Sequence, residues 1–334
     1  MNTFGGIKLK RYILKRTLRL VTTFLGAIAI IYFIFLAIPG NFVDGIVDPK
    51  LTQERIDQLN EKYHLNKPKT EQFVYWIKGA VHGDLGSMYA QRVNAKPIPV
   101  AQVVKYSATS TLKMMFFTML TSVLIAIPLA LRAALNAGKT KEKVIKTLST
   151  VGISLPAFII ALILLNILKS NRFAIGYFLN NKRYDEYNQF IAFITVTIIP
   201  FIVLNAVYIA NIVNYGYVSL AEIVRSEYIK CAYAMGIKER KILYKYTLKN
   251  GLIPILTIIG SCFPVMFCEV LVIESAIGRP GLGSLLLGAV RQRQYNILMA
   301  IILVSVLITL TCNYIVDMLY LAVDPRVKYQ YKKA

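Results

Sequence analysis

Four ionisable side chains lie inside long apolar runs, and they are the residues of this sequence that could handle charge within a membrane. They are Lys113, Glu269, Glu274 and Asp317. A charged residue at the centre of a bilayer costs about 2.5–3.5 kcal/mol on insertion scales, so each is a functional candidate by default. All but Glu269 lie near the ends of their runs, where we expect the side chain to snorkel to water. One deeper acid is too few for a proton relay, so the energy for any transport is expected to come from elsewhere.

The sequence lacks the common patterns for phosphate binding, hydrolysis and metal binding. It contains no G-x-x-x-x-G-K-[ST] loop, no G-x-S-x-G and no HExxH, and its two histidines are His64 and His82. The four cysteines have no CxxC spacing and lie in or beside apolar runs, which is typical of small buried hydrophobes. We therefore predict no catalytic residue, no metal ligand and no cofactor bound by this chain itself.

The composition is that of a membrane protein, with 56% hydrophobic and 17% charged residues among 334. Six runs are long enough to cross about 30 Å of hydrocarbon as helices. The first is too long for the apolar region of a signal peptide and lacks a cleavage site, so we interpret it as a retained span. We predict an all-α integral membrane protein whose spans cover residues 19–38, 112–131, 147–168, 190–213, 252–275 and 297–321.

Lysine and arginine are distributed unevenly between the two sides that six spans would define. The N-terminus to Arg19 and segments 132–146, 214–250 and 324–334 hold 22 basic and five acidic residues, whereas the opposite segments hold 16 and nine. Because basic segments stay on the cytoplasmic side, both termini are predicted to be cytoplasmic. The net charge of +22 does not indicate nucleic-acid binding, because the basic residues alternate with apolar runs and do not gather on a soluble fold.

The predicted spans imply a simple division of the chain. It consists of the N-terminus with the first span (1–38), an extracytoplasmic segment (39–111), a five-span core (112–322) that contains cytoplasmic segment 214–250, and a cytoplasmic tail (323–334).

The extracytoplasmic segment contains two stretches with apolar residues at helical spacing. The first, 51–65, has Thr52 as a candidate N-cap residue, followed by Ile56, Leu59 and Tyr63; the second, 70–80, has Phe73, Trp76, Ile77 and Ala80. We predict two short amphipathic helices outside the membrane. They could form a docking surface for a soluble partner, pack on the bundle or lie at the interface with Trp76 as an anchor.

Segment 214–250 is too polar to cross a bilayer and has good helix propensity on both sides of Gly236. A glycine at such a place ends a helix or admits close backbone approach. We therefore predict two short helices that meet near Gly236. A polar helix that protrudes from a bundle suits a groove on another protein.

Residues 228–236, YIKCAYAMG, followed by Lys249-Asn-Gly-Leu-Ile-Pro254, resemble the cytoplasmic signature of binding-protein-dependent ABC importer permeases. The resemblance is to the peptide/nickel family, in particular its oligopeptide and dipeptide B-type permeases. Further motifs carry the same resemblance in the same order. They are Gly83-Asp-Leu-Gly86-Ser87, Ser154-Leu-Pro156-Ala-Phe158, Glu274-Ser-Ala-Ile-Gly-Arg-Pro280-Gly281-Leu-Gly283, and Asp317-Met-Leu-Tyr320 with Asp324-Pro325-Arg326.

The resemblance implies a type I importer permease in a bacterial cytoplasmic membrane. Residues 225–240 would be the coupling helix, in which Ala232 and Gly236 permit close approach while Lys230, Lys238, Arg240 and Lys241 meet acidic groups of an ATPase. The residues implied to couple to the ATPase are Tyr228, Lys230, Cys231, Ala232, Ala234, Gly236, Ile237 and Lys238. Those implied in binding-protein docking or an outer gate are Gly83, Asp84, Glu274, Pro280, Gly281 and Gly283. Asp317, Tyr320, Asp324, Pro325 and Arg326 would form a structural motif.

The implied partners are a second homologous permease, two ABC ATPase subunits that bind ATP and Mg, an extracytoplasmic binding protein and membrane lipid, but no nucleic acid. Oligo- or dipeptides are the favoured cargo, and nickel or another chelate is the alternative for the same machinery. A secondary transporter or a channel subunit is the alternative from another class. The sequence shows neither the repeats nor the buried ion ligands that a secondary transporter would have.

Overall fold

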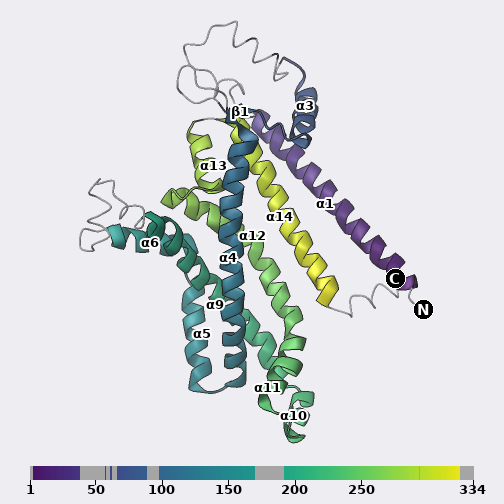
Figure 1. Ribbon diagram of the computed structural model, residues 1–334, viewed down its shortest axis with the longest axis vertical. Helices are drawn as coiled ribbons and strands as arrows, with labels where there is room; N and C mark the ends of the chain where they lie inside the picture. The colour runs from purple at the N-terminus through teal and green to yellow at the C-terminus, as the bar shows by residue number, and fades with distance from the viewer. Residues whose placement is uncertain are drawn as a thin grey trace. The chain divides into compact units, whose positions relative to one another are not determined.

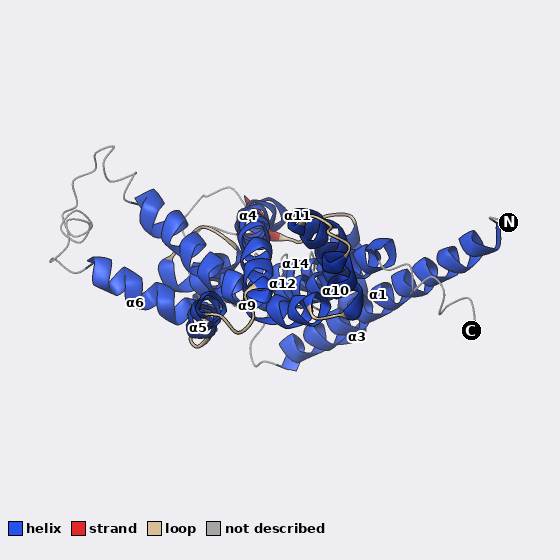
Figure 2. Ribbon diagram, turned by 90° about the horizontal axis from the view of Figure 1, so that it is seen from below, coloured by secondary structure: helices blue, strands red, loops and turns tan. Residues whose placement is uncertain are grey.

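The computed structural model describes residues 3–37, 57, 61, 66–88, 98–169, 192–292 and 294–323. Most of these residues are helical, in agreement with the predicted all-α fold (Figure 2). The helices are α1 (Thr3–Ala37), α3 (Lys69–Val81), α4 (Val100–Leu135), α5 (Thr140–Ile153), α6 (Ala157–Lys169), α9 (Ile199–Val224), α10 (Glu227–Ala234), α11 (Glu239–Lys241), α12 (Lys249–Ile277), α13 (Leu282–Arg291) and α14 (Tyr295–Val323) (Figure 1). Two π-helical stretches, η1 (Ile194–Ile198) and η2 (Ile242–Leu248), lead into α9 and α12.

The chain forms two compact units. The first contains residues 1–12, 113–279 and 312–334, and the second contains residues 13–112 and 280–311. Three of the four boundaries fall inside α1, α4 and α14, so each of these long helices contributes to both units.

The described residues contain five helices long and apolar enough to cross a membrane, and a sixth candidate consists of α5 and α6, which are bent by 85° at the break between them. The prediction of one continuous span at 147–168 is therefore wrong. Pro156 has no backbone N–H and its ring disfavours the helical conformation of Leu155, so the helix ends before the Ser154-Leu-Pro156 motif and restarts at Ala157.

Other helices extend well beyond their apolar runs. Helix α4 begins at Val100, before the predicted span at 112–131, and α9 continues to Val224, beyond the predicted span that ends at 213. An apolar run marks the length that hydrocarbon requires, whereas a helix continues until the backbone is interrupted. Residues 214–224, predicted to lie in a separate polar segment, are thus the last turns of α9.

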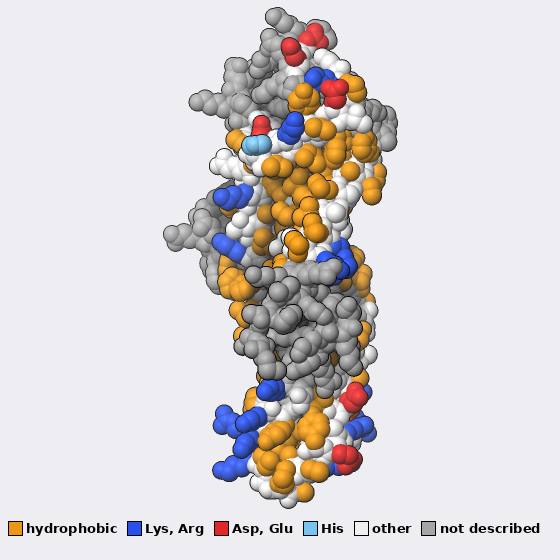
Figure 3. All heavy atoms as spheres, turned by 90° about the vertical axis from the view of Figure 1, so that its right-hand side faces the viewer, with side chains coloured by type: hydrophobic (Ala, Val, Ile, Leu, Met, Phe, Trp, Pro, Cys, Tyr) orange, Lys and Arg blue, Asp and Glu red, His pale blue; other side chains and the backbone are white. Residues whose placement is uncertain are grey.

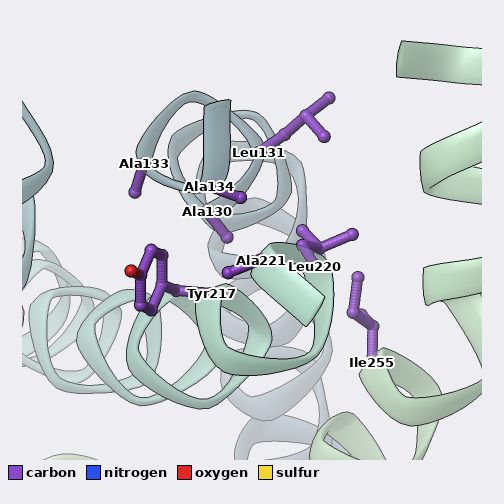
Figure 4. Close-up of a cluster of buried hydrophobic side chains, with 8 residues drawn as sticks. All are labelled: Ala130, Leu131, Ala133, Ala134, Tyr217, Leu220, Ala221 and Ile255. Atoms are coloured by element: carbon purple, nitrogen blue, oxygen red, sulfur yellow. The ribbon is translucent and has the colours of Figure 1, made fainter. Parts of the chain in front are cut away.

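In the first unit, α9 is the central helix and packs on α5, α6 and α12. Alanines of α4 meet the aromatic ring and aliphatic side chains of α9, and Ile255 of α12 completes the buried cluster (Figure 4). Glycines let the helices approach closely: a Cβ on Gly152 would lie 2.7 Å from that of Ala210, and a Cβ on Gly260 would overlap Val316. Small residues at helix contacts are typical of membrane bundles, where close packing holds helices together.

In the second unit, helix α3 confirms the second of the two predicted amphipathic helices. The first, at 51–65, falls almost entirely outside the described residues. Phe73 and Trp76 of α3 pack on Tyr32 of α1, with ring centroids 5.0 and 5.8 Å apart. Trp76 therefore contributes to packing on a long apolar helix, one of the alternatives that its position leaves open. Beyond α3, strands β1 (Ser87–Met88) and β2 (Ile98–Pro99) form a short antiparallel pair that the sequence did not predict.

Candidate functional site

Helix α10 is a short polar helix between two long apolar ones. Ser226 is its N-cap residue in an extended conformation, and Glu227 in the first turn complements the positive end of the helix dipole. Glu227 also pairs with Lys230 at 2.8 Å, but both side chains are exposed, so this pair adds little stability. The predicted helices on either side of Gly236 are present as α10 and as α11 with η2.

Gly236 ends α10 in a left-handed conformation with φ of +70°. Its N–H donates to the carbonyl of Tyr233 at 3.0 Å, and the N–H of Ile237 donates to that of Ala232 at 3.2 Å. These two bonds form the Schellman motif, which satisfies the last helical carbonyls. No atom lies within 4 Å of a Cβ built on Gly236, so its backbone conformation, and not crowding within the chain, favours glycine.

The inner face of α10 packs on the start of the next helix. Ile229 and Ala232 form a buried cluster with Ile242 of η2, and Ile237 and Tyr246 cover it. The sequence predicts Ala232 as a close-approach residue for a partner, but Ala232 is only 2% exposed. Its small side chain instead brings α10 close to η2, so the expected direct approach to another subunit is corrected to an internal packing role.

The outer face of α10 carries exposed apolar side chains among charged ones. Tyr228 and Met235 are 44% and 71% exposed, and Cys231 lies between them on the same face of the helix. Lys230, Lys238 and Arg240 are exposed as well. In Figure 3, hydrophobic side chains lie among basic and acidic ones at the end of the molecule where Figure 1 draws α10 and α11. Partial burial, and next the charge of Glu239, raises the pKa of Tyr233 above its ordinary value.

In the second unit, the Gly83-Asp-Leu-Gly86-Ser87 motif forms a tight turn after α3. Gly83 and Gly86 have φ values of +81° and +83°. The Asp84 carboxylate accepts a hydrogen bond from the Gly86 N–H at 2.9 Å, and the Asn296 side-chain amide of α14 donates to the Ser87 carbonyl at 3.3 Å. A Cβ on Gly86 would lie 3.2 Å from Nδ2 of Asn296. The motif therefore has a structural role that requires glycine.

The Pro280-Gly281-Leu-Gly283 motif, also in the second unit, is attached to α4. The Ser110 hydroxyl donates to the carbonyl of Pro280 at 2.6 Å, and the Leu282 N–H donates to the Thr111 hydroxyl at 3.0 Å. Leu282 is buried and begins α13. These bonds join residues about 170 positions apart, so Ser110 and Thr111 could not be recognised from the sequence as partners of the motif.

Replacing Gly86 tests whether the turn after α3 requires glycine at this position for the stability of the fold. We expect Gly86→Ala to lower the free energy of unfolding by about 1–3 kcal/mol, because the methyl group meets Asn296 and a left-handed backbone disfavours a side chain. Thermal unfolding of the purified chain measures this. Gly288→Ala is the control, since Gly288 is helical with no atom within 4 Å of an added Cβ, and alanine should leave the midpoint unchanged or raise it. Equal midpoints for both variants would contradict the assigned role of Gly86.

Glu274 forms a buried ion pair with Arg279. The distance from Oε1 to Nη1 is 2.7 Å, and Glu274 is fully buried. The prediction that Glu274 snorkels to water is therefore wrong. Helix α12 ends at Gly278 with φ of +78°, and this turn brings the arginine back over the last helical turn. The sequence did not predict Arg279 as the partner of Glu274, because Glu274 lies within α12 and Arg279 lies after the end of that helix. The opposite charges of these two residues, five positions apart, could have indicated the ion pair.

The remaining ionisable residues of the apolar runs have different surroundings. Glu269 of α12 accepts a hydrogen bond from the Tyr208 hydroxyl of α9 at 2.8 Å, which links two helices of the first unit. Lys113 is exposed, as snorkelling requires, and Asp317 is half-buried and makes an interaction within the chain. The side chain of Tyr320 and residues Asp324, Pro325 and Arg326 lie outside the described part of the structure.

A helical chain with five or six candidate spans and a polar helix between two of them is a multi-pass membrane protein. Residues 124–329 match the family described as binding-protein-dependent transport system inner membrane component. Residues 9–97 match the N-terminal region of the membrane component of these transport systems. The first match covers more than half of the chain, so the chain belongs to this family. It is a permease subunit of a binding-protein-dependent importer, and such subunits are not enzymes.

Curated relatives resemble the chain over almost its whole length. It is 31% identical over 320 residues to the oligopeptide transport system permease protein AppB of Bacillus subtilis, covering 95% of this chain and 99% of the relative. It is 30% identical to a probable peptide ABC transporter permease protein of Sinorhizobium fredii, with coverages of 95% and 99%. It is also 28% identical to the glutathione transport system permease protein GsiC of Escherichia coli, with coverages of 96% and 99%.

Proposed function

We propose that this chain imports oligo- or dipeptides as one of two permease subunits of an ATP-driven importer. Two full-length relatives bear peptide transport names, and a third is named for glutathione. The sequence motifs of this chain indicate a transport mechanism and not a substrate. The proposal that the substrate is a peptide therefore depends on the names of these relatives. The cargo would be selected largely by a separate binding protein.

Helix α10 would be the coupling helix. The observation that carries this proposal is that one face of the helix is buried within the chain and the other is exposed. Ile229 and Ala232 pack inward, whereas Tyr228, Cys231 and Met235 are exposed at the polar end of two apolar helices. Exposed apolar side chains on a protruding helix suit a groove of a partner protein. The exposed Lys238 and Arg240 would meet acidic groups on that partner, an ATPase subunit.

The contacts of α10 explain how a push on it would reach the bundle. Helix α9 ends two residues before α10 begins, and the cluster around Ile242 joins α10 to the helix that becomes α12. Asn250 at the start of α12 also donates to the Tyr228 hydroxyl at 3.0 Å. Closure of the ATPase pair would therefore displace α9 and α12 together and bias the permease between two states of access.

The proposed complex contains a second homologous permease subunit, two ATPase subunits and a substrate-binding protein. ATP and Mg would bind in the ATPase subunits and not in this chain. The basic segments, which include α10 and both termini, would lie in the bacterial cytoplasm. Helix α3 and the turn at Gly83 and Asp84 would then lie outside, where the binding protein docks.

Uptake by the complete complex tests the cargo and the energy source together. The complex is reconstituted in vesicles with the binding protein, and uptake of labelled peptides, glutathione and a nickel chelate is measured with ATP or with an ion gradient alone. We expect ATP-dependent uptake of peptides and none from the gradient. Uptake of the chelate but not of peptides would overturn the cargo, and gradient-driven uptake would overturn the mechanism.

A further inference from the structure

The turn between α4 and α5 in the first unit contains a basic cavity that the coupling mechanism does not use. The cavity has a volume of about 450 Å³. It is lined by Arg132, Asn136, Thr140, Lys141, Val144 and Ile145. Most of its surface is apolar, and the residues that line it include two cations, an amide and a hydroxyl. We propose that this cavity binds the headgroup of an anionic phospholipid.

The cations of the cavity are not neutralised within the chain. Glu142 is the one acid of segment 132–146, and its two oxygens accept hydrogen bonds from the Tyr217 hydroxyl and from the Gly138 N–H. This carboxylate therefore faces the helix bundle, where Lys146 is its nearest cation at 3.9 Å. Among the described residues, neither Arg132 nor Lys141 forms an ion pair. Two cations without an ion-pair partner among the described residues therefore line a mostly apolar cavity.

The start of α5 places a basic residue beside the cavity. Thr140 and Lys141 are its first two residues, and the N-cap residue, Lys139, makes no side-chain capping hydrogen bond. Glu142 in the same first turn complements the positive end of the helix dipole, so the positive charge near the cavity comes from the side chains of Arg132 and Lys141. A phosphate group meets these requirements because it offers several strong acceptor oxygens and at least one negative charge.

An exposed apolar stripe leads away from the cavity and identifies the phosphate as part of a lipid. Val144, Leu148 and Val151 follow Lys141 at helical spacing and so lie on one face of α5. Leu148 and Val151 are 67% and 65% exposed. A free phosphate would leave this stripe uncovered, whereas the acyl chain of a phospholipid would cover it. Basic pockets beside membrane helices suit such headgroups.

The test measures lipid retention by the purified complex with native mass spectrometry. Phosphatidylglycerol and phosphatidylcholine with identical acyl chains are titrated, and inorganic phosphate and glycerol 3-phosphate are added as competitors. The test variant is Arg132→Gln with Lys141→Gln. The matched control is Lys139→Gln with Lys143→Gln, which removes the same charge from the same turn but from residues that do not line the cavity.

We expect the complex to retain phosphatidylglycerol in preference to phosphatidylcholine, and the test variant to bind it about 25-fold more weakly. This follows from about fivefold for each basic residue near an anionic lipid. The control variant should lose less than about threefold at this site, and the soluble phosphates should not displace the lipid. Equal losses in both variants, equal retention of the two lipids or displacement by inorganic phosphate would each overturn the proposal. So would a test variant that keeps its lipid but no longer assembles with the ATPase, since the cavity would then receive an acidic protein surface.

Discussion

Removing the positive charge of Arg279 is expected to destabilise the chain more than any other single change considered. Arg279→Gln leaves the Glu274 carboxylate fully buried without the guanidinium that lies 2.7 Å from it. Breaking a buried ion pair by removing one partner costs about 3–5 kcal/mol, because the remaining charge has lost both water and its counter-charge. The midpoint of thermal unfolding of the purified complex should fall accordingly.

Two comparisons separate this effect from a general loss of charge. Lys230→Gln breaks the exposed pair with Glu227, which has a similar distance of 2.8 Å, and should cost less than about 1 kcal/mol. Glu274→Leu combined with Arg279→Met removes both charges and should recover most of the stability, because an apolar pair of similar volume often replaces a buried ion pair without loss. If the double variant is as unstable as Arg279→Gln, burial of an unpaired charge is not the cause.

Replacing Gly236 by valine is expected to weaken strongly the coupling of ATP hydrolysis to uptake. A β-branched residue at a φ of +70° is strained by about 1–3 kcal/mol, and the chain relieves this strain by leaving the Schellman motif. The end of α10 would then no longer be joined to Ile237 and the cluster around Ile242. In the reconstituted complex we expect normal assembly, at least tenfold slower uptake and continued basal ATP hydrolysis.

The matched variant for this experiment is Gly236→Asn. Asparagine tolerates the left-handed conformation better than other side chains, so this variant adds bulk without changing the backbone. It should keep most of the uptake if the conformation of Gly236 is what coupling requires. Loss of uptake in Gly236→Asn as well would point to close approach by the partner, because the space around Gly236 is open within this chain. Normal uptake in Gly236→Val would remove α10 from the coupling mechanism.

The class of the protein and most of its helices were predictable because their signals are local. Apolar runs of about 20 residues require helices in hydrocarbon, which located most of the spans within a few turns. The glycine at 236, between two stretches of good helix formers, predicted the end of α10. The order of the motifs from Gly83 onward indicated the family, and the match to residues 124–329 confirms it.

The features that could not be predicted depend on which side of a helix meets another element. Helical spacing alone did not reveal that Ala232 faces Ile242, or that Ser110 and Thr111 hold a motif about 170 residues away. Likewise, the sequence does not show that Glu142 accepts a hydrogen bond from Tyr217, which lies on another helix. The helices and the family could be predicted from the order of residues alone, because backbone hydrogen bonding and hydrophobic length are local properties. The pairing of side chains between distant helices was decided by packing in three dimensions, which no single stretch of sequence contains.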